Sequence, residues 1–106
     1  MKLPSTIKIG AHTYQVKPED VPFLNDGNTG LAGTIDLRGG TIRVVAVGSP
    51  DSIVAETLLH EILHGISFNR DIGLSESQVD QVAAGLMALF VDNPELVKLI
   101  TQTQAK

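Results

Sequence analysis

Apolar and polar residues alternate along the first half of the chain, as they do in β-strands that bury one face. The alternation over Thr6 to Lys17 is interrupted by a turn at Gly10 and predicts a hairpin. Pro18 and Pro22 are expected to end this unit, because proline cannot donate a backbone hydrogen bond. A loop of turn-forming residues, Asn25 to Gly30, is expected to follow.

A second hairpin is predicted from Leu31 to Leu37 and Thr41 to Val47, which flank the turn residues Arg38-Gly39-Gly40. In Thr41 to Val47, nearly every position is apolar. This pattern is typical of a strand that is covered on both faces.

The second half of the chain changes to a helical pattern. A first helix is predicted to begin at Ser49 and Pro50, as N-cap and first helical residue, and to end near Phe68. Apolar residues occupy much of its circumference, so we expect it to be largely buried. After the breaker Gly73, three helix signals follow: an N-cap at Ser75 or Ser77, a helix end near Val91, and a short third helix with Asn93 as N-cap and Pro94 in its first turn.

These patterns predict one α+β domain over residues 1–106, β-rich over 1–47 and helical over 49–106. The expected architecture is a small N-terminal antiparallel or mixed sheet of hairpins, followed by two or three helices.

Composition narrows the possible functions. Eight Lys and Arg stand against twelve Asp and Glu, for a net charge of −4, and the basic residues form no stripe. Nucleic-acid binding is therefore not expected. The absence of cysteine excludes disulfides and thiolate chemistry, and it favours a cytoplasmic location. No apolar stretch is long enough to predict a signal peptide or a membrane span.

The candidate chemistry lies in the first predicted helix, where residues 60 to 64 read HEILH. His60 and His64, at i and i+4, share one helix face with Cβ atoms about 5–6 Å apart, so both rings can bind one zinc ion. Glu61 is rotated about 100° from His60 and is expected to act on a zinc-activated water as general base. The His-Glu-x-x-His pattern thus provides two zinc ligands and a general base on one helix.

Simpler interpretations compete with this one. His60 and His64 could be core histidines bonded to backbone carbonyls, and Glu61 could be a solvated acid at an exposed helix edge. His12 is interpreted as an ordinary surface residue in a turn. Tyr14 could donate to an oxyanion, but a half-buried strand tyrosine is favoured. Two apolar residues of the second helix, Met87 and Phe90, are interpreted as core.

Residues 57 to 66, TLLHEILHGI, resemble the extended signature of the zincin metallopeptidases. Thr57 is a β-branched residue three positions before the first histidine, Ile62 and Leu63 are uncharged, and Ile66 is apolar two positions after the second histidine. The chain also resembles the small zincin-like proteins of phages and prophages, through LSESQVD at 74–80, AGL at 84–86 and DNPEL at 92–96. The resemblance implies a minimal zincin-like fold and zinc-dependent peptide hydrolysis.

The resemblance also discriminates between subclasses. A metzincin would have Gly and His where this chain has Ser67 and Arg70, so that subclass is excluded. The gluzincin pattern, a Glu ligand followed four residues later by Asp, is matched by Glu76 and Asp80, although the gap after His64 is shorter than in the large gluzincins.

The third ligand can also be approached from the residues. No cysteine exists and His12 lies in the distant hairpin, which leaves a carboxylate of the second helix. Glu76 and Asp80 begin a stripe that is apolar from Val79 onward, and we expect it to face the core. Glu76 is assigned as the ligand, with Asp80 accepting the free ring N–H of a ligand histidine. These acids could instead serve the helix dipole, or exchange roles.

The leading hypothesis is a zinc metallopeptidase with one zinc per chain, bound by His60, His64 and Glu76. Its peptide or protein substrate is expected to add along the Thr41 to Val47 strand. A metal-stabilised binding or assembly protein without catalytic activity is the alternative, and a metal-free fold is a third reading. The oligomeric state is left open.

Overall fold

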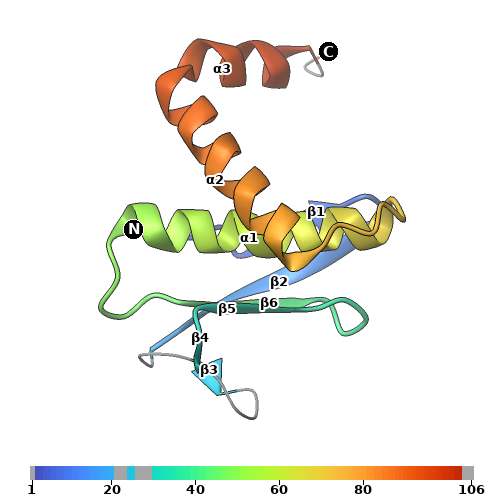
Figure 1. Cartoon of the computed structure of the whole chain (residues 1–106), viewed down its shortest axis with the longest axis vertical. Coiled ribbons are helices and arrows are strands. Elements are labelled where there is room, and N and C mark those ends of the chain that lie inside the picture. Colours follow the sequence, from blue (N-terminus) through green and yellow to red (C-terminus); the bar gives the residue numbers. More distant parts are fainter. Residues whose placement is uncertain (1, 21–23, 26–29, 104–106) are drawn as a thin grey trace.

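The computed structural model describes residues 2–20, 24–25 and 30–103, and it confirms the α+β class with a mixed sheet followed by three helices (Figure 1). Four strands form one sheet in the order β1-β2-β6-β5, and two very short strands pair separately. The strands of the sheet are β1 (Thr6–Ile9), β2 (His12–Glu19), β5 (Gly33–Asp36) and β6 (Thr41–Val45); the short pair is β3 (Leu24–Asn25) and β4 (Gly30–Leu31).

Both predicted hairpins are present, β1 with β2 and β5 with β6. Their joining was not predicted: β2 and β6 run parallel, with Gln15 opposite Thr41. The predicted end at Pro18 is wrong, because β2 continues to Glu19. Backbone N–H groups alternate between the two sides of β2, with Gln15 donating towards β6 and Val16 donating to Ser5. The missing N–H of Pro18 therefore falls on the side of β2 that β1 no longer reaches, where proline is tolerated.

Two further expectations concern the segment between β2 and β5. Pro22 as a breaker and most of the predicted loop from Asn25 to Gly30 lie outside the described residues.

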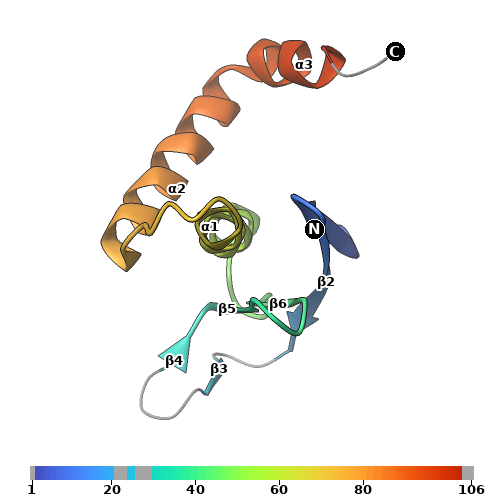
Figure 2. The ribbon, with the colours of Figure 1, turned by 90° about the vertical axis from the view of Figure 1, so that its right-hand side faces the viewer.

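Helix α1 (Asp51–Asn69) lies across one face of the sheet (Figure 2). Tyr14, Ile42 and Val44 project from the strands into the core and pack with Val54 and Leu58 of the helix. The prediction of a largely buried helix is confirmed, since no residue from 54 to 67 is exposed.

The expectation that Thr41 to Val47 forms a strand covered on both faces is wrong. Arg43 of β6 is exposed, and so is its neighbour Lys17 on β2, on the face away from α1. In the described part of the chain, helix α1 covers one side of the sheet, and Arg43 on the other side is exposed although Val45, two residues further on, is buried.

The helix boundaries follow the local signals closely. The N-cap of α1 is Pro50 and not Ser49, a shift of one residue. Helix α2 (Glu76–Asp92) begins with a full capping box, in which Ser75 and Gln78 bond each other's backbone. Helix α3 (Pro94–Gln102) follows Asn93 as predicted, but the Asn93 side chain donates to the Leu89 carbonyl instead of capping.

Helix α2 packs on α1 mainly through its first half, and Leu86 is the last residue of α2 in this contact. Val79 and Ala83 are buried against Leu63 of α1, and the helix then leads away from the sheet, with α3 at its far end (Figure 1). The prediction that Met87 and Phe90 are core residues is wrong for Phe90, which is 37% exposed, while Met87 is partly buried. The apolar stripe that begins at Val79 continues beyond the part of α2 that α1 covers. We call residues 84–103 the C-terminal arm.

Within the residues described, no helix combines the length and the apolar content that a bilayer crossing requires.

Candidate metal centre

Two histidines on α1 form the base of the site. His60 and His64 are one helical turn apart, and their ring centroids are 5.0 Å apart. Both side chains are mostly buried but reach solvent. Their ring contacts are made with carboxylates of α2, which argues against core histidines bonded to backbone carbonyls.

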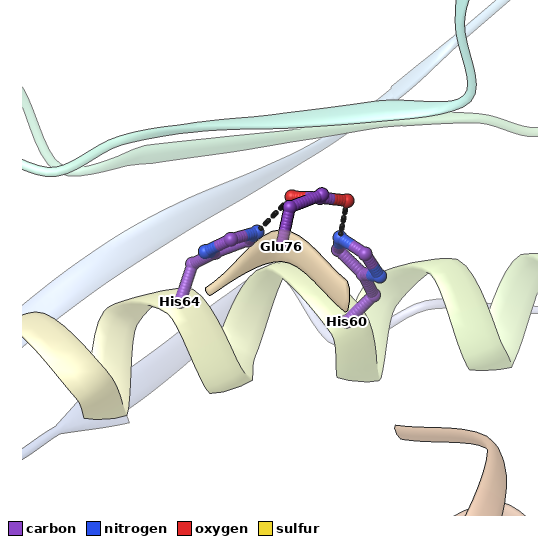
Figure 3. Close-up of side chains that lie close together, drawn as sticks. All are labelled: His60, His64 and Glu76. Carbon is purple, nitrogen blue, oxygen red and sulfur yellow. Dashed lines mark hydrogen bonds and ion pairs between the residues drawn. The ribbon is translucent and has the colours of Figure 1, made fainter. Parts of the chain in front are cut away.

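Glu76, the first residue of α2, completes the cluster. Its carboxylate lies between the two rings, with Oε2 at 2.8 Å from Nε2 of His60 and Oε1 at 2.8 Å from Nε2 of His64 (Figure 3). The connection that positions Glu76 is held to the end of α1, because the Ser67 hydroxyl accepts a hydrogen bond from the backbone N–H of Leu74.

This donor set has the composition of a catalytic zinc site. One donor atom from each of His60, His64 and Glu76 lies within 4.8 Å of the other two. Two donors of a tetrahedral zinc ion are separated by roughly 3.3 Å. The contact of 2.8 Å from Glu76 to each ring is somewhat shorter than this separation. Two nitrogens and one oxygen are the protein ligands of several catalytic zinc centres, in which a fourth position stays open.

Asp80 lies one turn further along α2. Its Oδ1 is 3.5 Å from Nδ1 of His60, the ring nitrogen that faces away from Glu76. The structure therefore brings together His60, His64, Glu76 and Asp80, with Glu76 between the two rings and Asp80 beside the ring of His60.

The expectation that Glu76 and Asp80 lie on a core-facing stripe is nevertheless wrong. The side chains of Glu76 and Asp80 are 72% and 73% exposed, so they do not lie on a core-facing stripe. The stripe is buried only at Val79 and Ala83, whose packing on Leu63 holds this end of α2 beside the histidines. The cost of burying a carboxylate consequently plays no part in their placement.

Glu61 is the buried member of the group, with 7% of its surface exposed, which excludes a solvated acid at a helix edge. Burial raises the pKa of its carboxyl above the ordinary value of 4.5; His60 and His64 oppose this rise and Glu76 adds to it. Its Cγ lies against Gly33 of β5, where a Cβ would come within 3.3 Å of it and within 2.8 Å of Cγ2 of Thr57. Only glycine lets the strand approach the helix this closely.

The cluster opens into a cleft of about 840 Å³ between α1, β5 and the start of α2, which we call the metal cleft. Residues of β5 on its wall were not singled out from the sequence, because the pairing that makes β5 an edge strand is long-range. The lining residues that the argument uses are Gly33, Ile35, His60, Glu61, His64 and Glu76.

Two other candidates stay outside the site. His12 is an exposed residue beside the first turn, as predicted. Tyr14 is 2% exposed and not half-buried, and its hydroxyl donates to the Leu37 carbonyl at 3.5 Å. It does not line the metal cleft, so a role as oxyanion donor is excluded.

No protein-family model, curated protein or solved structure matches this chain.

The two carboxylates of α2 are expected to differ in their effect on zinc affinity. Glu76→Ala removes a carboxylate whose two oxygens each contact one of the rings, and it should weaken zinc binding by more than about 100-fold. Asp80→Ala, acting through His60, should weaken it by about 10–100-fold. Competition with a chromophoric chelator measures both. The reverse order would exchange their roles, and wild-type affinity in both would place the third ligand elsewhere.

The buried Glu61 carboxyl also predicts a pH dependence for chelator-treated protein. Because the pKa is raised on folding, the folded state holds this proton more tightly than the unfolded state does. The resulting stability is fully present below pH 4.5 and is lost as pH rises through the folded pKa. Glu61→Gln should therefore unfold at higher urea than wild type at pH 7, and the difference should shrink towards pH 4.5.

Glu95→Gln, on the exposed surface of α3, is the control and should leave the urea midpoint unchanged at both pH values. If the urea midpoint of Glu61→Gln equals that of wild type from pH 4.5 to pH 7, burial of the Glu61 carboxylate does not lower the stability of the folded state.

Proposed function

We propose that this protein is a zinc-dependent metallopeptidase. The observation that carries the proposal is the convergence of His60, His64 and Glu76 next to the buried carboxylate of Glu61, in a cleft open at the edge of a sheet. Structural zinc sites are commonly closed by four protein ligands, whereas three ligands and an open cleft favour chemistry.

Each residue has a separate task in this proposal. His60, His64 and Glu76 hold the zinc, which supplies a Lewis acid that polarises a carbonyl and lowers the pKa of water. Glu61 accepts the proton of the attacking water and passes it to the leaving amine. Its raised pKa suits this role, because a general base works best with a pKa close to the operating pH.

The substrate is proposed to be a peptide that adds to the edge of the sheet. The expected place, Thr41 to Val47, is not available, because β6 is paired with β2 on one side and with β5 on the other. The edge strands of the described sheet are β1 and β5, and β5 is the one that lines the metal cleft. Val45 donates to the Ala32 carbonyl, so by antiparallel alternation Gly33 and Ile35 direct their N–H and C=O groups outward, beside the metal cleft.

The test is cleavage of a mixed peptide library by zinc-loaded protein, read by mass spectrometry. We expect defined cuts that stop after chelation and return when zinc is added. Protein that binds zinc stoichiometrically but leaves the library intact under all conditions would contradict the proposal.

A metal-stabilised binding or assembly protein is the second candidate, and the C-terminal arm favours it. Val91, Leu99 and Ile100 are exposed there, and no residue of α3 is buried. A short helix gains little stability without packing, which suits an arm that docks on another molecule. In that case, a Glu61→Gln protein would retain all function.

A further inference from the structure

A second pocket, of about 250 Å³, adjoins the metal cleft next to His60. It lies between the start of β5, the first half of α1 and the side of α2 that carries Asp80. Gly33, His60, Glu61 and Glu76 line both pockets; Ala32, Ile53, Glu56, Thr57 and Asp80 line only the smaller one.

The smaller pocket is strongly acidic. Four carboxylates line it, those of Glu56, Glu61, Glu76 and Asp80, and its lining includes no Lys or Arg. In the part of the chain that is described, Glu56 forms no ion pair, and no hydrogen bond is donated to the side chain of Glu61, a residue that is 7% exposed. With zinc held by His60, His64 and Glu76, Glu56 would still line the pocket without a partner among the described residues, while Asp80 lies 3.5 Å from Nδ1 of His60.

The position of the pocket fits one side chain of a bound peptide. A strand added to β5 would pass Gly33, whose backbone groups point to the free edge. Side chains of such a strand alternate between its two faces, so those on the α1 side enter the space beside His60 and Glu61. Ile53 and Thr57 offer apolar contacts to a long methylene stem, and the acids lie around them.

We propose that this pocket binds a lysine or arginine side chain of the substrate, next to the bond that is cleaved. The inference rests on the proposed function only in placing the basic side chain next to a cleaved bond. Recognition of that side chain depends on the pocket and on the β5 edge. Glu56 is the specificity-determining residue, since it lines the pocket and is not one of the three residues that could hold the metal.

The test measures binding of acetylated, fluorescein-labelled glycine-rich peptides that carry a central lysine or norleucine. These residues have the same straight stem and differ in the ammonium group. Zinc-loaded Glu61→Gln protein, which should not turn the peptide over, is titrated and followed by fluorescence anisotropy. We expect the lysine peptide to bind about fivefold more tightly, as a partly exposed ion pair allows.

Adding Glu56→Gln should bring the lysine-to-norleucine ratio close to one without changing zinc content, while Glu95→Gln on α3 should leave the ratio intact. Equal affinity for the two peptides, no binding of the lysine peptide, or a preference that survives Glu56→Gln would each overturn the inference. Selective binding of the lysine peptide by a protein whose wild type cuts no peptide would contradict the proposed function and support the pocket's role.

Discussion

His64→Ala protein is expected to lose stoichiometric zinc. The imidazole supplies one of only three protein donors, and its Nε2 contacts the Glu76 carboxylate at 2.8 Å. Loss of a direct ligand should weaken affinity by more than the 10–100-fold typical of groups that only orient a ligand. Metal content after gel filtration, measured by plasma mass spectrometry, should fall from about one zinc per chain to near zero.

The same substitution should remove the zinc-dependent part of thermal stability. An ion present at about 100 times its Kd stabilises the folded state by about 2.7 kcal/mol, which corresponds to a rise in Tm of roughly 10–20 °C for a domain of this size. Wild type should show this rise on adding zinc, and His64→Ala should not. His12→Ala, at the exposed first residue of β2, is the matched control and should behave as wild type.

If His64→Ala retains both zinc and the rise in Tm, the site is misassigned.

Glu61→Gln is expected to abolish peptide hydrolysis while zinc remains bound. The amide keeps the shape of the side chain between α1 and Gly33 but cannot accept a proton at neutral pH. Removing a general base costs about 10²–10⁴-fold in rate, so cuts in the peptide library should become undetectable in a matched incubation. Zinc content should stay at about one per chain.

The two readouts of this variant separate its interpretations. Loss of zinc from Glu61→Gln would make Glu61 a ligand, and unchanged hydrolysis would remove it from the reaction. Glu95→Gln, on the exposed surface of α3, is the control and should retain cleavage of the library.

Local signals in the sequence predicted the elements that depend on neighbouring residues. The capping box at Ser75, the start of α3 at Pro94 and the pairing of His60 with His64 all follow from spacings within one or two helical turns. The two hairpins were likewise predictable, because each is closed by its own glycine-containing turn, with Gly10 and Gly40 at positive φ.

Features that depend on distant parts of the chain were not predictable in this way. The parallel pairing of β2 with β6 leaves β5 at the edge, and it explains why Pro18 is tolerated within β2. The length of α2 that is covered depends on where α1 lies, so Phe90 continues the apolar stripe but is 37% exposed and lies outside the described core clusters. The carboxylates Glu76 and Asp80 reach the histidines although they are exposed, which a burial argument could not anticipate.

A crystal of the zinc-loaded protein, with diffraction recorded on both sides of the zinc absorption edge, tests the central claim most directly. The account predicts one anomalous peak per chain, at about 2.0–2.2 Å from Nε2 of His60, Nε2 of His64 and a carboxylate oxygen of Glu76. A peak that lacks any one of these three ligands, or no peak between α1 and α2, would contradict it.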